Sequence, residues 1–239
     1  MLLVAGCTSS QNYQWGWYVF NPSHPKGAVN LKFMLSGLGL TLAISLSAIA
    51  LSVVVGLLIA LAGLSKHPLL RAVNRTYVEV FRAIPLLVLL LWVYYGLPII
   101  LGLQLSAFAA GVLSLALSDA AFEAEVFRAG IQSVPRGQSE AAETLGFSAW
   151  QRFRLIILPQ AIKAILPALG NQFIYVLKMS SLVSIIGLQD LTRRANELNV
   201  SEYRPLEIYT LLVVEYLLLI LAVSWLVRRL EKRLATGRG

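Results

Sequence analysis

Five ionisable side chains lie within or near long apolar runs of this 239-residue chain, namely Asp119, Glu123, Glu125, Lys178 and Glu215. Charged groups are expensive in lipid and usually face a water-filled cavity or a partner group. Asp119 and Glu123 are four residues apart, so they share one helix face. Lys178 precedes the hydroxyls of Ser180 and Ser181. A set with both signs of charge indicates either a path for a polar solute or an internal ion pair.

The composition predicts that lipid is the main solvent of the chain. Hydrophobic residues make up 57% and charged residues 13%, with a mean hydropathy of +0.71, whereas a soluble domain averages about 25% charged residues. The apolar runs lack the alternation of barrel strands, and only helices or closed barrels satisfy the backbone in lipid. We therefore expect an all-α integral membrane protein.

The apolar runs divide the chain into five expected membrane spans and two flanking segments. The spans are placed at roughly 35–63, 84–101, 105–126, 162–187 and 207–227. One membrane domain then covers 35–230, with a lead-in at 1–34 and a tail at 231–239. The opening MLLVAGC resembles a lipoprotein cleavage site but lacks a basic region and a long enough apolar run, so its status as the true start stays open.

The basic residues set the orientation of these spans. Fourteen of the 20 Lys and Arg residues follow the first, third and fifth spans, and basic residues mark cytoplasmic loops. The N-terminus is therefore expected outside and the C-terminus inside the cell, with the insert at 128–163 and the tail in the cytoplasm. The net charge of +8 is explained by this topology, so we expect no nucleic-acid partner.

The cytoplasmic insert is charged, helix-prone and interrupted by glycine. Its segment Gln138–Leu145 consists of good helix formers, with Ser139 as the expected cap. Gly146 follows at the position where a left-handed glycine ends a helix, and a second helix is expected to start near Ser148. The insert is therefore predicted to be a helix–turn–helix corner that projects from the membrane.

The sequence motif of this corner resembles one that is typical of a known family. The pattern E-A-A, three residues, G, nine residues, I-x-L-P is met by Glu140, Ala141, Ala142, Gly146, Ile156, Leu158 and Pro159. It resembles the EAA loop of the membrane subunits of ABC importers. Further sequence segments, at 80–87, 122–125, 130–138 and 177–182, resemble those of the polar-amino-acid permease family. The resemblance covers about 35–230.

The resemblance implies partners and a division of labour. In the family this corner is a coupling helix in a groove of a cytoplasmic ATPase, which assigns that contact to Glu140, Ala141, Ala142 and Gly146. A second permease, of the same or a sister chain, and an outer solute-binding protein complete the expected importer. The chain has no G-x-x-x-x-G-K-[ST] phosphate loop. It is therefore not expected to be an enzyme or to hold a cofactor or metal, and ATP-Mg is expected on the ATPase.

A polar amino acid carries both an α-carboxylate and an α-ammonium group, and its path must offer both signs of charge. Lys178, beside Ser180 and Ser181, could meet the carboxylate, and Asp119, Glu123 or Glu215 could meet the ammonium. The alternative is an internal pair between Lys178 and an acid that only holds helices together. The sequence leaves both interpretations open.

Some residues depart from the family pattern. Many members carry a polar residue at Met179, and Asp119 and Glu215 stand where neutral residues are expected. These acids leave the particular amino acid undetermined. The charged segment 188–206 is the expected outer landing surface for the binding protein.

Two other classes of function compete with an importer subunit. A proton-coupled secondary carrier could use Asp119, Glu123 and Glu215, and dependence on ATP separates it from an importer. An intramembrane enzyme is disfavoured, because His24 and His67 are the only histidines and no nucleophile–base arrangement is evident.

Overall fold

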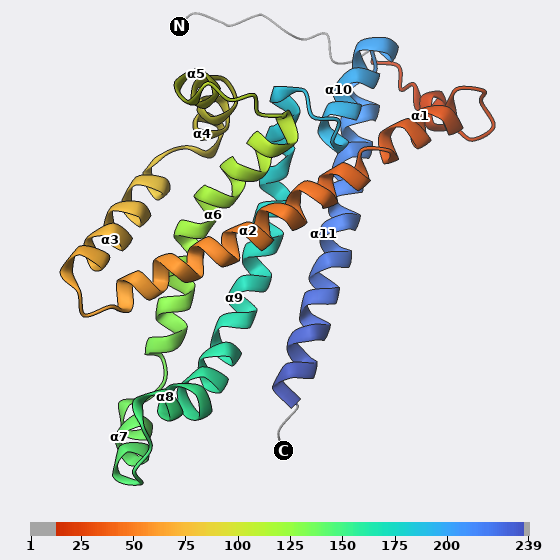
Figure 1. Cartoon of the computed structure of the whole chain (residues 1–239). Helices are drawn as coiled ribbons and strands as arrows, with labels where there is room; N and C mark the ends of the chain where they lie inside the picture. Colours follow the sequence, from red (N-terminus) through yellow and green to blue (C-terminus); the bar gives the residue numbers. More distant parts are fainter. Residues whose placement is uncertain (1–12, 237–239) are drawn as a thin grey trace, which may run out of the picture.

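The fold is that of a bundle of long helices, described for residues 13–236 in a computed structural model. Its main helices are α2 (Leu38–Leu64), α6 (Ala107–Gln132), α9 (Leu158–Met179) and α11 (Pro205–Thr236). They run between two ends of the molecule (Figure 1). Within the described residues, four helical stretches are long and apolar enough to cross a membrane, and a bent pair could provide a fifth. The expected all-α membrane architecture is confirmed.

Helix α2 packs closely on α6 through a ladder of small residues. Ala48, Ser52, Gly56 and Ala60 recur at every fourth position and are buried. Small residues at this spacing let helix backbones approach each other in a membrane. A Cβ added at Gly56 would lie 2.9 Å from the Cβ of Glu123 on α6, so only glycine fits at that crossing.

The expected span at 84–101 corresponds to an unbroken helical run over 86–101, and a sharp bend separates this run from a further helix that the sequence did not predict. The chain forms α3 (Pro68–Ala83), α4 (Leu86–Leu91), a π-helical segment η3 (Trp92–Gly96) and α5 (Leu97–Leu101). The path bends by 101° between the part before and the part after residues 84–85. Pro85 has no N–H and disfavours a helical residue before it, and Ile84 is extended. The basic connection after the first span is thus largely the amphipathic helix α3.

The fourth span begins earlier than expected. Helix α8 (Ala149–Arg152) leads through a π-helical segment η4 (Phe153–Ile157) into α9, and a 3₁₀ segment η5 (Ser180–Ile186) ends this rod. The rod starts 13 residues before the expected position 162. Pro159 follows η4 directly, and its missing N–H removes one hydrogen bond to the preceding turn of the rod.

The expected outer loop at 188–206 is mostly helix α10 (Leu191–Glu202), and the lead-in contains η2 (Trp17–Phe20) and α1 (Gly27–Leu35). The lead-in lies against the end of the bundle that carries α10. Arg204 donates to the carbonyl oxygen of Gln14 at 2.9 Å, and Lys26 pairs with Glu202 at 3.0 Å. Residues 1–12, with the expected start region, and 237–239 lie outside the described residues.

Candidate coupling loop and intramembrane polar residues

Helix α7 (Arg136–Thr144) forms the first arm of the corner. It ends as expected at Gly146, whose φ is +81°. The Gly146 N–H donates to the Glu143 carbonyl at 2.9 Å, and the Phe147 N–H donates to the Ala142 carbonyl at 3.0 Å. This paired pattern closes the helix around a left-handed residue. The assignment of Ser139 as the cap is wrong, because Pro135 starts the helix one turn earlier.

The second arm starts at Ser148, as the sequence predicts. Ser148 and Gln151 form a reciprocal capping box at the start of α8. An ion pair between Arg152 and Glu143 joins the two arms. The corner is thus braced by its own polar contacts, and Gln160 on α9 also donates to Gln138 on α7.

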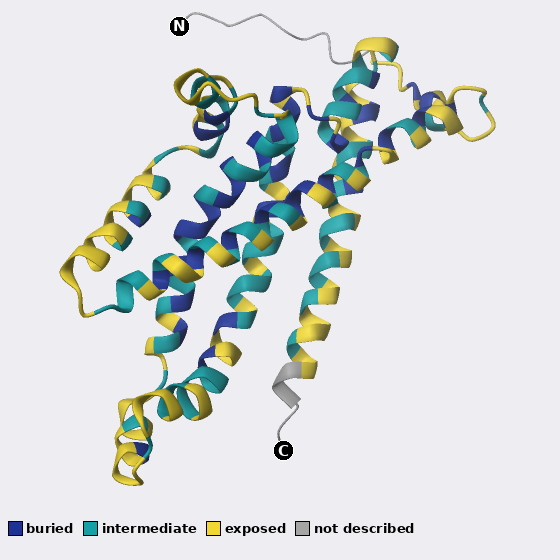
Figure 2. Ribbon diagram, viewed as in Figure 1, coloured by how far each residue is buried: buried dark blue, intermediate teal, exposed yellow. Residues whose placement is uncertain are grey.

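The corner exposes only some of the residues assigned to it. Glu140, Ala141 and Gly146 are exposed, whereas the Ala142 side chain is 2% exposed and packs beneath the corner. Figure 2 shows the corner as a mostly exposed projection at one end of the molecule. Leu145, 77% exposed, stands beside the turn. The sequence reasoning passed over this leucine, although an apolar residue next to a turn glycine in a polar loop is a signal for a contact surface.

Asp119 and Glu123 share one face of α6, as their spacing predicts, and both are buried against α2. Ser52 donates to Asp119 at 2.8 Å, and Gln172 on α9 donates to the other carboxylate oxygen. Asp119 therefore ties three helices together. Sequence reasoning missed Ser52 and Gln172, which are distant in the chain.

Glu123 differs from Asp119 because no described residue gives it a hydrogen bond of normal geometry, although Ser52 and the carboxyl of Asp119 lie beside it. Its side chain is fully buried, and neither carboxylate oxygen has a partner among the described residues. Glu215 on α11 has a similar environment, since its side chain is 9% exposed and its two carboxylate oxygens have no partner among the described residues. A buried charge without partners is strongly disfavoured, so these two carboxyls are the least satisfied polar groups of the interior.

Lys178 is exposed on α9 and forms no ion pair with any described residue. The structure therefore does not bring it into a pair with Asp119, Glu123 or Glu215. The alternative of an internal Lys178–acid pair is not formed within this chain. Lys178 lies in the last turn of α9, and an exposed ammonium on a membrane helix must meet water, solute or a second subunit.

The two serines after Lys178 serve the helix end in this structure. Ser180 is buried and donates to the Leu177 carbonyl at 2.8 Å, and Ser181 donates to the Lys178 carbonyl at 2.9 Å. These bonds accompany the change from α9 to the 3₁₀ segment η5. The hydroxyls therefore lie near Lys178 in sequence while bonding to backbone.

Glu125 has the structural environment that its position near Arg128 indicates. It pairs with Arg128 at 3.7 Å and, more closely, with Arg82 on α3. The guanidinium of Arg82 also lies 5.1 Å from the ring centre of Phe122. Arg82 is a partner that sequence reasoning missed, because it lies on a helix that was expected to be a connection.

The chain has the features of a multi-pass membrane transport subunit, since it combines long apolar helices, buried carboxyls and a corner that projects from one end. Residues 52–236 match the family described as "Binding-protein-dependent transport system inner membrane component", and the chain belongs to this family. Such proteins are permease subunits of ABC importers in the inner membrane, and a separate subunit hydrolyses ATP. The chain is therefore a permease subunit and not an enzyme.

Named relatives and solved structures are consistent with this family. The glutamine transport system permease GlnP of Escherichia coli is 34% identical over 222 residues, covering 92% of this chain and 98% of its own. The putative GlnP of Rickettsia typhi is 37% identical, covering 84% and 93%. An amino acid ABC transporter crystallised with histidines has a chain 43% identical, with a TM-score of 0.81 over 86% of this chain and 96% of its own.

A more distant structure supports the fold alone. The methionine ABC transporter MetNI in an inward-facing form has a chain 21% identical to this one. Its TM-score is 0.72 over 85% of this chain and 97% of that chain. The helical arrangement is therefore shared well beyond the range of close sequence similarity.

Proposed function

We propose that this permease imports a polar amino acid, driven by ATP hydrolysis on a partner subunit. The single observation that carries the proposal is the 43% identity to a chain of an amino acid ABC transporter, over nearly all of that chain. The relatives named as glutamine permeases agree with this substrate class. No relative identifies which amino acid this chain carries.

The corner of α7 and α8 is the proposed contact with the ATPase, which would hold ATP-Mg. Glu140, Ala141 and Gly146 are exposed there, and Leu145 adds an apolar contact. Ala142 is buried and would support the contact through packing within the corner. A corner fixed by a left-handed glycine and an ion pair can transmit a push, because it does not bend when its tip is displaced.

Lys178 is the strongest candidate for the substrate path. Its exposed ammonium, without a protein partner, can attract an α-carboxylate on the face of α9 where a second permease would pack. Glu215 remains the candidate for the ammonium group of the substrate. Asp119 and Glu123 are enclosed by α2 and α6, so a path role for them requires these helices to separate; Ser180 and Ser181 would contribute their hydroxyls by releasing the backbone.

The remaining partners follow from the family and the proposed orientation, with the N-terminus outside and the C-terminus inside. An outer solute-binding protein would dock over α10, where Arg193, Arg194 and Glu197 form a charged surface. A second permease, of the same or a sister chain, would complete the path between two subunits.

Co-purification tests the coupling contact. Gly146→Val forces a β-branched residue into a left-handed turn and should reduce recovery of the ATPase by at least about tenfold, while the permease stays in the membrane. Gly39→Val is the matched control, since a Cβ there meets nothing within 4 Å. Equal ATPase recovery with both variants would refute the coupling role.

A further inference from the structure

A basic cavity lies at the end of the bundle that carries the coupling corner. It has a volume of about 600 Å³ and lies between α3, the end of α2 and the last turns of α6. Its charged lining consists of Arg71, Arg75, Arg82, Arg128, Glu79 and Glu125. We call it the arginine pocket. Neither coupling nor the proposed substrate path uses this cavity.

The charges in the arginine pocket do not cancel. Arg75 pairs with Glu79 at 2.8 Å, and Arg82 and Arg128 share Glu125. Arg71 forms no ion pair with any described residue, so four cations face two carboxylates. Guanidinium groups bind phosphate oxygens with paired, directional hydrogen bonds. The pocket is therefore built for an anion with several oxygens.

A second cavity lies beyond the C-terminal end of α3 and is lined mainly by α4 and η3. It has a volume of about 500 Å³ and is almost entirely apolar, with Phe81, Ile84, Val88 and Leu117 in its lining. Phe81 and Ile84 flank in sequence the residues Arg82 and Ala83 that line the arginine pocket. We call it the apolar groove. The two cavities thus lie on either side of the bend that follows α3, and α6 contributes to the lining of each.

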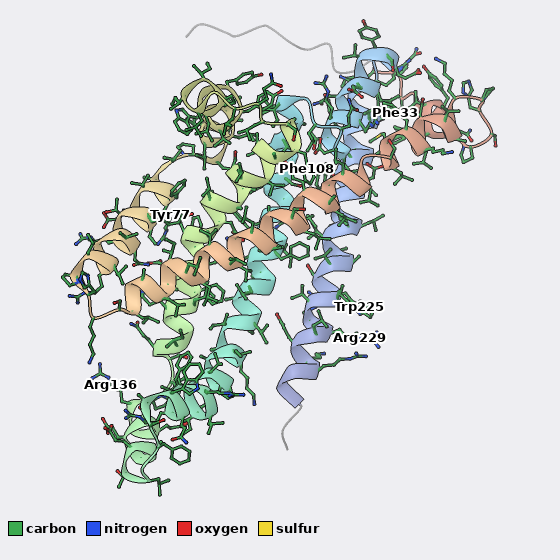
Figure 3. The ribbon with its side chains drawn as sticks, viewed as in Figure 1. Phe33, Tyr77, Phe108, Arg136, Trp225 and Arg229 are labelled. Carbon is green, nitrogen blue, oxygen red and sulfur yellow. The ribbon has the colours of Figure 1, made fainter. Side chains whose placement is uncertain are left out.

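The length of this pair of cavities matches a lipid in one leaflet. Leu117 in the apolar groove and Arg128 in the arginine pocket are eleven residues apart on α6, which is about 16 Å along a helix. Half of a bilayer's hydrocarbon core is about 15 Å thick. Tyr77, labelled in Figure 3, donates to the Leu117 carbonyl at 2.9 Å and holds α3 against α6 between the cavities.

We propose that an anionic phospholipid of the cytoplasmic leaflet occupies this place, with its phosphate in the arginine pocket and an acyl chain in the apolar groove. Basic pockets between helices on the cytoplasmic side bind acidic headgroups in this manner. The inference rests on the proposed orientation, which puts the coupling end in the cytoplasm. A bound lipid would hold α3 beside α2 and α6 and so stabilise the bent second span.

The test uses the full chain with its co-purified subunits, stripped of lipid in detergent and titrated while native mass spectra are recorded. Phosphatidylglycerol should bind at least about tenfold more tightly than phosphatidylcholine with the same acyl chains. The double variant Arg71→Gln/Arg75→Gln should lose this preference, because two surface arginines together contribute about thirtyfold in affinity. Arg136→Gln/Arg154→Gln removes two exposed arginines away from the pocket and should keep the preference.

A second variant tests the apolar groove and the nature of the anion. Val88→Trp fills the groove at a residue that is 55% exposed, and should weaken phosphatidylglycerol binding at least about tenfold. Inorganic phosphate is the comparison probe. Equal binding of the two lipids, or loss of preference in the control variant, would overturn the proposal. So would displacement of the lipid by millimolar phosphate without any effect of Val88→Trp, which would show a site for a free anion.

Discussion

The buried carboxyls of this chain fall into two kinds, according to whether a donor reaches them. Asp119 receives hydrogen bonds from Ser52 and Gln172. Glu207 receives them from the Gly16 N–H and the Tyr13 hydroxyl. Glu123 and Glu215 receive none from the described residues. Carboxyls of the first kind link segments of the chain by hydrogen bonds. Carboxyls of the second kind lower stability, so stability does not explain their presence.

Substitution of Glu123 and Ser52, which both lie between α2 and α6, tests this distinction. Glu123→Met keeps most of the side-chain volume and removes two unsatisfied oxygens, so the melting temperature of the permease should stay level or rise. Ser52→Ala removes a donor to Asp119 and should cost about 1–3 kcal/mol. Thermal unfolding in detergent measures both. A large loss for Glu123→Met beside an unchanged Ser52→Ala would contradict the assignment.

At the residue scale, the sequence predicts local relations and misses distant ones. The shared face of Asp119 and Glu123 and the left-handed turn at Gly146 follow from spacing and residue type, and the structure has both. The residues that donate to Asp119 are 67 and 53 positions away in the chain, and no local sequence pattern indicates these contacts. The Lys178–acid pair could not be decided from sequence, because it depends on which way α9 faces.

At the element scale, the contact between α2 and α6 depends on a glycine. Gly56→Ala adds a Cβ 2.9 Å from the Glu123 Cβ and 3.1 Å from the Ala120 carbonyl oxygen, and should cost about 1–3 kcal/mol of stability through overpacking. Gly39→Ala on the same helix meets nothing within 4 Å and should be neutral or slightly stabilising. The two melting temperatures are the measurement, and equal values would mean that the helices are not closely packed at Gly56.

The start of α10 should make stability depend on pH. Asp190 caps this helix by accepting the Arg193 N–H at 2.8 Å, and the Tyr216 hydroxyl also donates to it, at 3.4 Å. Burial raises the pKa of Asp190 from 3.8 to about 6, although these hydrogen bonds oppose the change. Between these values the folded state binds more protons than the unfolded state. The stabilising contribution is therefore complete below about pH 4 and lost as the pH rises through 6.

Asp190→Asn separates the cap from the charge, since asparagine also caps helices. The variant cannot ionise, so its stability advantage over the natural chain should grow by about 1–2 kcal/mol from pH 5 to pH 7.5. Melting temperatures of both chains at the two pH values decide the matter. A constant difference would show that Asp190 does not titrate in this range.

The spans were predictable as elements because lipid-facing helices leave long uncharged runs. The amphipathic helix α3 and the charged helix α10 were not, because their composition is that of loops and their helical state depends on packing against the bundle. The bend at residues 84–85 has a visible cause in Pro85, but proline alone does not say whether a span is kinked or divided. The turn between α7 and α8 was predicted accurately, since the glycine at Gly146 and the cap at Ser148 act locally, whereas the start of α7 at Pro135 was missed.

At the scale of the whole molecule, the coupling corner and Lys178 lie on one rod, formed by α8, η4 and α9. Lys178→Met keeps most of the stem and removes the charge, so substrate flux should fall at least about tenfold while ATPase recovery is unchanged. Lys163→Met, at an exposed lysine on the same helix, is the control and should transport normally. Flux restored by combining Lys178→Met with Glu215→Gln would argue for a structural pair instead of a substrate contact.

The most direct test of the account is uptake by proteoliposomes that contain the permease, its ATPase and its solute-binding protein. Glutamine and other polar amino acids, labelled one at a time, serve as candidate substrates. The account predicts that at least one of them accumulates only when ATP and the binding protein are both supplied, and that collapsing the proton gradient changes nothing. Accumulation driven by an imposed proton gradient without ATP would contradict it and would identify the chain as a proton-coupled carrier.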